Sequence, residues 1–409
     1  MDALRVLADD LTGACDVGAE LLPGPGGVVV QPALEAREPG PRGATCVRNT
    51  QSRTLAPADA ARRVAAVLTD VGPGWAGLVL KKIDPGLRGP LGAEVDATME
   101  ALGLDEAFVL PAIPEVGRAT RAGRQMIGGI PVNETAFARD PHHPIRDASV
   151  PGALEATGRR RTAVIDVTAV RGDMAVAVER ARAGGAGVLV CDAETDADLE
   201  RAVRTLLLRA RPLLLVGSTG LARALRRVLR TEHAGRVLRP SGPPPLPGDG
   251  ILVVAGSAHP ATRGQIERAA ERGLLRPIEV ASLAGADWAG AQAARALASG
   301  SAPALIAPAA TSPAGGAGVL AALRRAALTT LARERPRGLV LVGGETAYHV
   351  LEGLGLPALW LESRLCPLVV RARLMAGAWA GLAVVTKGGS SGAPDLLASI
   401  VRQLARGAG

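Results

Sequence analysis

Short apolar runs alternate with amphipathic segments along the first half of the chain. The first run ends at Ala8, and helices are predicted over Pro57–Thr69 and Gly92–Leu102; the first of these opens with proline, which is favoured in a helix's first turn. Further strands are predicted at Gly26–Gln31, Ala44–Arg53, Gly77–Ile83, Ala107–Leu110, Thr162–Val167, Gly187–Cys191 and Pro212–Val216. Strands that alternate with helices indicate an α/β fold with a doubly wound, mainly parallel sheet and helices on both faces.

The polar residues of this region gather where the predicted strands end. Asp9 and Asp10 directly follow the first strand, and Lys81, Lys82 and Asp84 close another. An open α/β sheet binds its ligands beyond the carboxyl ends of its strands, so the paired acids are candidates for holding a metal ion or a substrate hydroxyl. The alternative is that one of them caps the helix that follows. The recurrence of polar strand ends favours a site, with Asp10 facing the substrate and Asp9 either sharing that site or capping the helix.

The segment Gly117–Val150 differs from its surroundings. It is rich in Arg, Gly, Pro and His and has weak periodicity, which predicts a long irregular stretch. Such stretches in compact domains are more often functional than accidental. His142 and His143 lie here, but a histidine pair without further ligands is more often solvated than metal-binding, so the metal ligands stay unknown.

A proline-rich segment divides the chain. Residues 240–248 read Pro-Ser-Gly-Pro-Pro-Pro-Leu-Pro-Gly, which packs neither as a helix nor as a central strand. We predict a linker at 233–250 that separates a first domain, 1–232, from a second domain, 251–409.

Three predicted strands of the second domain run into turns rich in glycine and hydroxyl groups. The strands are Ile251–Ala255, Leu339–Val342 and Gly381–Val385, and the turns contain Gly256-Ser257, Gly343-Gly344-Glu345-Thr346 and Thr386-Lys387-Gly388-Gly389. Backbone amides and helix dipoles at such turns suit anionic oxygens. Neither a Walker A motif nor a dinucleotide fingerprint is present. Three such turns in one domain favour a nucleotide site.

Composition narrows the class of protein. The chain has 409 residues, 48% of them apolar and 2% aromatic, and a formal net charge of +8. Nucleic-acid binders concentrate positive charge and interleave aromatics, so we expect no nucleic-acid partner and favour a cytoplasmic enzyme that acts on a small anion. The four scattered cysteines show neither metal-ligand spacing nor a disulfide framework, which fits a reducing compartment. We expect no signal peptide and no membrane span.

Several motifs together resemble the four-carbon acid sugar kinases, a family of ATP-dependent enzymes that phosphorylate threonate, erythronate, 3-oxo-tetronate and related acids. The resemblance extends along nearly the whole chain in the correct order. The motifs are Ala8-Asp9-Asp10-Leu11-Thr12-Gly13-Ala14, Asn49-Thr50-Gln51-Ser52-Arg53, Lys81-Lys82-Ile83-Asp84 with Leu87-Arg88-Gly89, Pro111-Ala112-Ile113-Pro114 with Gly117-Arg118, Val254-Ala255-Gly256-Ser257, Gly343-Gly344-Glu345-Thr346-Ala347 and Thr386-Lys387-Gly388-Gly389.

The resemblance implies an N-terminal acid-sugar domain, a C-terminal nucleotide domain, and roles for individual residues. It implies catalytic roles for Asp10, Lys82 and Asp84, substrate binding by Asp9, Ser52, Arg53, Arg88 and Arg118, and ATP binding by Ser257, Gly343, Gly344, Glu345, Thr346, Lys387 and Gly388. Arg53 or Arg88 would grip the carboxylate, and Asp10 or Asp84 would orient the attacking hydroxyl while Lys82 stabilises the transferred group. Mg²⁺ is implied with the nucleotide.

The chain also departs from the family pattern. Cys15 and Pro90 each stand where relatives usually carry Asn, Pro85-Gly86 stands where they carry Ser-Thr, and the turn at Ser390–Ser391 lacks its usual aromatic or Asn. Two alternatives therefore stay open: a regulator that binds sugar acid or nucleotide and has lost turnover, and a kinase of a non-acid sugar. Which acid is used and how many subunits assemble, a homo-oligomer included, are not determined at this point.

Overall fold

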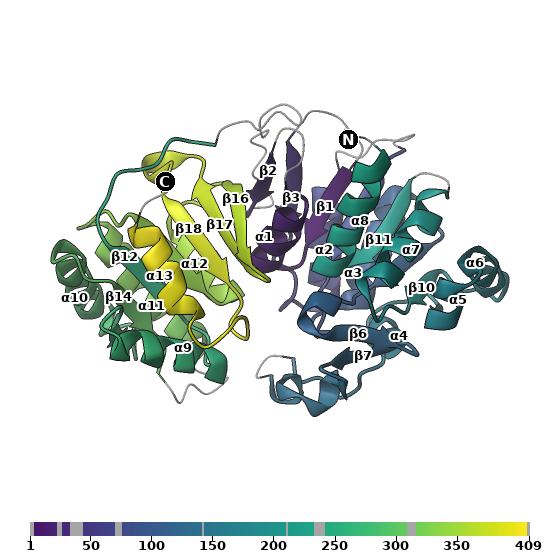
Figure 1. Cartoon of the computed structure of the whole chain (residues 1–409), viewed down its shortest axis with the longest axis horizontal. Helices are drawn as coiled ribbons and strands as arrows, with labels where there is room; N and C mark the ends of the chain where they lie inside the picture. Colours follow the sequence, from purple (N-terminus) through teal and green to yellow (C-terminus); the bar gives the residue numbers. More distant parts are fainter. Residues whose placement is uncertain are drawn as a thin grey trace. The chain divides into compact units, whose positions relative to one another are not determined.

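The computed structural model of the chain describes residues 4–22, 27–32, 44–69, 76–140, 143–209, 212–232, 242–308 and 316–406. Contacts divide the chain into two compact units, Met1–Val28 with Ala33–Arg239 and Val29–Pro32 with Pro240–Gly409 (Figure 1). Both units are mixed α/β, which confirms the predicted fold class. Residues 233–241 of the predicted linker lie outside the described residues, so its limits stay a prediction.

The N-terminal unit is built on a parallel sheet. Its strands follow the order β3-β1-β4-β11-β5-β10-β9, and every neighbouring pair in this series is parallel. The bounds are β1 Leu4–Ala8, β3 Thr45–Asn49, β4 Leu78–Lys82, β5 Ala107–Leu110, β9 Thr162–Ile165, β10 Val188–Cys191 and β11 Leu213–Gly217. The strand predicted to continue to Arg53 ends earlier, at Asn49, because the chain turns there and Gln51 takes a positive φ of 45°.

Helices cover both faces of this sheet. Helix α3 packs against α2 and α4 in one group of helices. Helix α8 packs against α1 and α7 in a second group. The bounds are α1 Leu11–Glu20, α2 Pro57–Val67, α3 Leu91–Leu102, α4 Val150–Glu155, α5 Val167–Arg171, α6 Met174–Ala183, α7 Asp196–Leu207 and α8 Thr219–Glu232.

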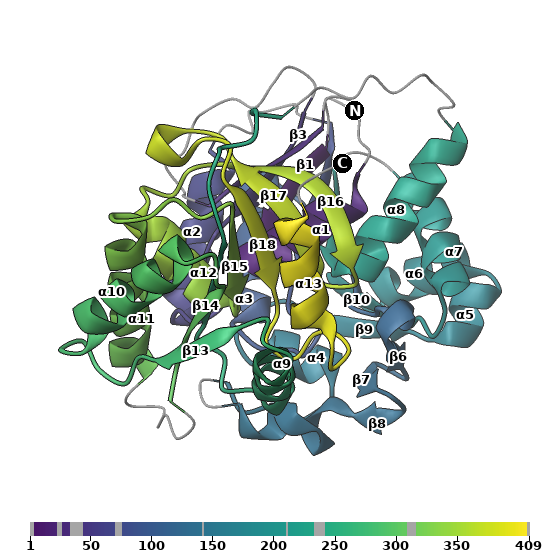
Figure 2. The ribbon, with the colours of Figure 1, turned by 60° about the vertical axis from the view of Figure 1, so that its left-hand side comes forward.

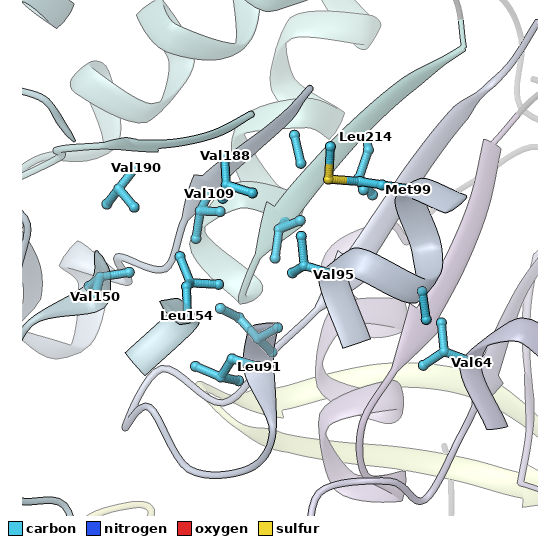
Figure 3. Close-up of a cluster of buried hydrophobic side chains, with 14 of the residues drawn as sticks. Val64, Leu91, Val95, Met99, Val109, Val150, Leu154, Val188, Val190 and Leu214 are labelled. Atoms are coloured by element: carbon cyan, nitrogen blue, oxygen red, sulfur yellow. The ribbon is translucent and has the colours of Figure 1, made fainter. Parts of the chain in front are cut away.

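The core beneath α2, α3 and α4 is made mainly of branched aliphatic side chains, with alanines and Met99 among them. Figure 3 shows Val95 and Met99 of α3 pointing toward strand residues that include Val109 and Leu214, with Leu154 of α4 alongside. These side chains are almost entirely buried. Removing such apolar area from water stabilises the unit and holds α3 against the sheet.

The segment predicted to be irregular is partly regular. It contains a small antiparallel sheet, β6 Arg118–Arg121, β7 Arg124–Ile127 and β8 Ile130–Pro131, and the short 3₁₀ helices η2 Val132–Glu134 and η3 Ala136–Arg139, and η1 Pro114–Val116 directly precedes the segment. The prediction was wrong because tight turns with positive φ at Ala122-Gly123 and Gly128-Gly129 connect strands too short to show a period in the sequence. His142 lies outside the described residues.

The C-terminal unit has a mixed sheet in the order β13-β14-β12-β15-β18-β17-β16-β2. The first five strands are parallel, and β17, β16 and β2 each run antiparallel to the strand before them in that order. The bounds are β2 Val28–Gln31, β12 Ile251–Ala255, β13 Arg276–Glu279, β14 Pro303–Ile306, β15 Gly338–Val342, β16 Leu359–Cys366, β17 Val369–Leu374 and β18 Ala383–Lys387. Val29–Pro32, most of β2, belongs by its contacts to this unit.

Helices also flank the C-terminal sheet. Helix α10 packs against α11 and α11 against α12, whereas α9 packs against α13, which lies in front of the strands in Figure 2. The bounds are α9 Pro260–Glu271, α10 Ala286–Ala298, α11 Gly316–Leu331, α12 Gly344–Gly353 and α13 Leu396–Ala405, with the short 3₁₀ helix η5 at Gly377–Trp379. Within the described ranges, the helices are too short or too polar for any to cross a bilayer.

Candidate functional site

The end of strand β1 carries a buried cluster of two acids and two bases. The Arg53 guanidinium donates from Nε to Asp9 Oδ2 at 2.8 Å and from Nη2 to Asp9 Oδ1 at 2.9 Å, and it also contacts Asp10 Oδ1. The Lys82 ammonium donates to Asp9 Oδ1 at 3.1 Å and to Asp10 Oδ1 at 3.0 Å. The two carboxylates are 1% and 3% exposed, so this is a desolvated ionic network. Sequence reasoning placed all four residues in one site, and the structure brings them together.

The order of the strands explains this convergence. Strand β1 lies between β3 and β4, so the loop 50–53 after β3 and Lys82 at the end of β4 flank Asp9 and Asp10. Side chains of a strand alternate between the two faces of its sheet. Lys82 therefore points to the same side as the start of α1, whereas Lys81 points to the opposite side and toward α3, where it pairs with Glu94.

Asp10 is both a helix cap and a member of the cluster. It is the N-cap of α1, where Oδ1 accepts the Gly13 amide at 3.1 Å and Oδ2 accepts the Thr12 hydroxyl at 2.5 Å. The hypothesis that Asp9 caps the helix was wrong, since Asp9 binds Arg53 and Lys82 and the cap is Asp10. A cap side chain is fixed by the helix it starts, so Asp10 holds its position without help from a ligand.

The charges in the cluster stabilise one another. Burial raises the pKa of Asp10, but the charges of Arg53 and Lys82 outweigh burial and bring the pKa below its usual range. The same balance lowers the pKa of Asp9. For Lys82 burial lowers the pKa, and Asp10 and Asp9 more than compensate, so the net pKa is raised. At neutral pH both carboxylates are therefore ionised and Lys82 is protonated.

The loop that follows β4 holds a second ion pair. Arg88 grips Asp84 bidentately, from Nε to Oδ2 at 2.8 Å and from Nη2 to Oδ1 at 3.0 Å, and its Nη1 reaches Asp140 Oδ2 at 3.0 Å. Burial raises the pKa of Asp84, but the charges of Arg88 and Arg53 lower it by more, so the pKa is well below its usual range. Asp84 is thus a second fixed anion near Arg53.

Ser52 lies beneath the cluster and is completely buried. Its hydroxyl lies 2.6 Å from the Thr50 hydroxyl and donates to Glu94, which also accepts from Lys81 Nζ at 2.8 Å. The structure therefore places Ser52 as a support for the loop that carries Arg53. Sequence reasoning missed Glu94. The signal that could have found it is an acid in the first turn of α3, on the side of the sheet to which Lys81 points by strand alternation.

Arg118 differs from the other cations of this region. Among the described residues it makes neither an ion pair nor a side-chain hydrogen bond, and its guanidinium carbon lies 5.6 Å from the centre of the Phe137 ring. Burial lowers the pKa of Arg118, and Asp84 raises it only in part. Arg118 is a half-buried cation whose charge is incompletely neutralised by the described residues.

In the C-terminal unit the three glycine-rich turns meet. Strand β15 lies between β12 and β18, and all three are parallel, so the turns after them leave the same edge of the sheet. A Cβ atom at Gly256 would lie 2.3 Å from Thr346 Oγ1, and one at Gly389 would lie 2.1 Å from Ser257 Oγ. These distances show that the three turns touch through hydroxyl groups and bare backbone.

The middle turn opens helix α12. Gly343 is its N-cap with a φ of 107°, a conformation that favours glycine, and its amide donates to the Lys387 carbonyl at 2.9 Å. Gly344, Glu345 and Thr346 form the first turn, where amides lack partners within the helix. The N-terminus of a ten-residue helix beside two further turns provides donors for phosphate oxygens.

The turns are braced from α9. Thr262 Oγ1 donates to the Gly389 carbonyl at 2.7 Å, and Gln265 Nε2 donates to the carbonyls of Ser391, Gly392 and Ala393 at 3.1, 3.2 and 2.9 Å. These bonds hold the segment after β18 in place.

Lys387 ends β18 and is fully buried. Its ammonium donates to the Gly388 carbonyl at 2.9 Å, and burial lowers its pKa to about 8. It is therefore a cation at neutral pH that a neighbouring anion would stabilise strongly.

The acids present do not form a metal cage. Within the described ranges no three His, Cys, Asp or Glu side chains are grouped as metal ligands, and Asp9 and Asp10 already bind cations of the protein. A divalent ion that arrived with a nucleotide would take its ligands mainly from phosphate oxygens and water.

Comparison with protein families agrees with the division into two units. Residues 4–225 match a family model described as a sugar-binding N-terminal domain, and residues 252–397 match one described as a nucleotide-binding C-terminal domain. The clusters at the end of β1 and at the ends of β12, β15 and β18 lie in these two matched regions.

Curated relatives match the chain over most of its length. A D-threonate kinase of Bordetella bronchiseptica is 32% identical over 96% of this chain and 95% of its own, and a D-erythronate kinase of Heliobacterium modesticaldum is 28% identical over 99% and 97%. A D-threonate kinase of Salmonella typhimurium is 34% identical over 67% of this chain, and that match spans 62% of the relative. A solved structure from Salmonella typhimurium LT2 shares the fold, with a TM-score of 0.79 at 22% identity, and covers 98% of this chain and 100% of its own.

Proposed function

This chain belongs to the family of four-carbon acid sugar kinases, and from that premise we propose that it transfers the terminal phosphoryl group of ATP to a hydroxyl of a four-carbon acid sugar. The observation that carries the proposal is the buried network of Asp9, Asp10, Arg53 and Lys82 at the end of β1. A network of fixed, opposite charges supplies what phosphoryl transfer needs, which is positioning and charge stabilisation and little covalent chemistry.

The acid's carboxylate would bind to the cation whose charge is not already neutralised by an ion pair. Arg53 is engaged by Asp9 and Asp10, and Arg88 by Asp84 and Asp140. Arg118 has no such partner among the described residues. We therefore propose Arg118 as the primary ligand of the carboxylate, with Arg88 beside it. Guanidinium groups bind planar carboxylates through paired N–H donors.

The hydroxyl to be phosphorylated would be oriented by Asp10 or Asp84. Both carboxylates are ionised at neutral pH, and their lowered pKa values make them weak bases. Their role is therefore to accept the hydrogen bond of the hydroxyl and align its oxygen, with the proton leaving late. Lys82, which stays protonated, would stabilise the charge on the transferred group.

ATP would bind at the three turns of the C-terminal unit. The hydroxyls of Ser257 and Thr346, the amides of Gly343–Glu345 and Gly388, and the Lys387 ammonium are the groups that support this proposal. Mg²⁺ would enter with the nucleotide and neutralise its β- and γ-oxygens. We place the reaction in the cytoplasm, since the four scattered cysteines of the sequence show no disulfide framework.

A coupled assay of ADP release tests this function. The wild-type chain is given ATP with D-threonate, D-erythronate or 3-oxo-tetronate, with the uncharged polyol threitol as the matched control, while ATP binding is measured separately by calorimetry. We expect turnover on at least one acid and at least about a hundredfold lower kcat/KM on threitol, because a half-buried guanidinium left without its anion is costly. ATP binding without turnover on any acid would favour the regulator, and equal turnover on threitol would favour a kinase of a non-acid sugar.

A further inference from the structure

One aromatic ring contacts both guanidinium groups that face the proposed carboxylate site. The Phe137 ring centre lies 5.1 Å from Arg88 Cζ and 5.6 Å from Arg118 Cζ. A cation held over the face of an aromatic ring is attracted by the ring's negative quadrupole. Phe137 thus fixes two like charges close to one another, an arrangement that favours an anion between or beside them.

The ring is held in position from several sides. It packs half-buried against the core cluster of the N-terminal unit, and the Phe137 carbonyl accepts the amides of Asp140 at 3.2 Å and Ile145 at 3.0 Å. Arg88 is in turn tied to Asp140. The segment that carries the ring is therefore anchored to the loop after β4.

The loop after β4 leaves room for the ring. A Cβ atom at Gly86 would lie 2.3 Å from Phe137 Cε1 and 2.8 Å from Asp84 Oδ2. Any side chain at position 86 would push against the ring or the carboxylate, so Gly86 and Phe137 fit each other sterically.

Phe137 has different consequences for the two arginines. Arg88 is already oriented by its ion pairs with Asp84 and Asp140. Arg118 has no ion pair among the described residues, and the Phe137 ring lies against its guanidinium. Loss of the ring would therefore leave Arg88 in place and free Arg118 to move.

We propose that Phe137 is a positioning residue for carboxylate recognition: it holds Arg118 beside Arg88 so that both guanidiniums meet the acid's carboxylate. The proposal rests on the proposed function, because it assigns the carboxylate end of that same site. It predicts that the ring determines affinity for the acid and does not contribute to the transfer step.

Three variants and a control test the role of the ring. Phe137→Leu keeps an apolar side chain but removes the ring face, Phe137→Tyr keeps the ring, and Gly86→Ala displaces the ring while Phe137 remains. The matched control is Trp379→Leu, which removes the ring from another arginine contact, 5.8 Å from Arg335, in the C-terminal unit. The readouts are KM and kcat for the acid, KM for ATP, and the thermal midpoint.

We expect Phe137→Leu to raise KM for the acid about 5- to 30-fold, the range of one desolvated cation–π contact, with kcat and KM for ATP within about twofold. Gly86→Ala should raise KM for the acid to a similar degree and leave KM for ATP within about twofold, and its kcat is not used as a criterion because the new Cβ also lies 2.8 Å from Asp84 Oδ2. Phe137→Tyr should stay within about threefold of wild type, and Trp379→Leu should leave all three constants unchanged. In an Arg118→Lys background, Phe137→Leu should raise KM by less than about threefold, because the group that it positions is already altered.

Two results would overturn the inference. One is an unchanged KM for the acid in Phe137→Leu, whether or not kcat and the thermal midpoint fall. The other is a rise in KM for the acid that is equally large in Phe137→Leu and Phe137→Tyr, because Tyr keeps the ring. If wild type turns over no acid, the proposed function fails separately. Calorimetric titration of D-threonate into wild type and Phe137→Leu then decides this inference, and equal affinities would refute it.

Discussion

The replacement of Asp10 by Asn isolates the charge of the cluster from its geometry. Asn is as good an N-cap as Asp, so the first turn of α1 should keep its cap, and the side chain keeps its size. What is lost is one of the two negative charges that face Arg53 and Lys82, whose contacts with Asp10 include a hydrogen bond of 3.0 Å from Lys82 Nζ. Two buried cations then share one carboxylate.

The structure allows the loss of stability and the loss of turnover in Asp10→Asn to be estimated. Removing one partner from a buried ion pair costs about 3–5 kcal/mol, and because Asp9 remains we expect the free energy of unfolding to fall by about 3 kcal/mol. Loss of one fixed electrostatic contact in the transition state costs about 3–4 kcal/mol, so kcat/KM for the acid should fall by about 10²- to 10³-fold.

The assay is ADP release at saturating ATP, paired with urea unfolding followed by circular dichroism. Asp166→Asn is the matched control: Asp166 caps α5 in the same way, accepting the Ala169 amide at 2.8 Å, but it is exposed, and none of the residues that the structure describes forms an ion pair with it. It should change stability by less than about 0.5 kcal/mol and leave turnover intact. Wild-type turnover in Asp10→Asn, or a stability loss no greater than that of Asp166→Asn, would refute the reasoning.

Three further changes probe other parts of the structure. Burial lowers the pKa of Lys387 to about 8, so its ammonium loses its proton as pH rises through that value. We therefore expect kcat/KM for ATP to fall above about pH 8 in wild type but not in Lys387→Arg. A flat wild-type profile between about pH 6.5 and 9.5 would contradict this. Gly343→Ala places a Cβ 3.2 Å from Thr346 Oγ1 at a φ of 107°, and the strain should raise KM for ATP about tenfold while KM for the acid stays constant, with a rise in both counting against separate sites. Glu94→Gln leaves the Lys81 ammonium buried without a charged partner and should lower the free energy of unfolding by about 3–5 kcal/mol; a urea midpoint equal to wild type would exclude that role.

Most of the parallel part of the fold was predictable because many of its strands are short apolar runs, several of them with polar residues at the end. That regularity also identified Asp9, Asp10, Lys82 and Asp84 as candidates, since parallel strands end at a common edge. Strands β13 and β14 were not predicted, since β13 carries charged residues at both ends and β14 has only four residues. The order of the strands in the sheet could not be predicted from the pattern of apolar and polar residues. The placement of β1 between β3 and β4, which joins Arg53 to the acids, became visible only in three dimensions.

Other features were missed for physical reasons. The antiparallel pair β16 and β17 contains register shifts and charged positions, so it lacks a clean alternation in the sequence. Phe137 lies in a segment of very short elements, and its contacts with Arg88 and Arg118 join positions far apart in the chain. Its one signal was rarity, since it is one of two phenylalanines in the chain.

The resemblance to four-carbon acid sugar kinases is confirmed at the level of the family, but the choice of acid is still a proposal. Relatives of similar identity are named for D-threonate and for D-erythronate.

Transfer of a labelled phosphoryl group tests the central claim most directly. The wild-type chain is incubated with ATP labelled at the γ-phosphorus and with D-threonate, D-erythronate or 3-oxo-tetronate, and the products are separated and their masses determined. We predict that the label appears in one acid, heavier by one phosphoryl group, and that Asp10→Asn forms this product at least about a hundredfold more slowly. Label recovered only in inorganic phosphate or in unreacted ATP, with every acid unchanged, would contradict the account.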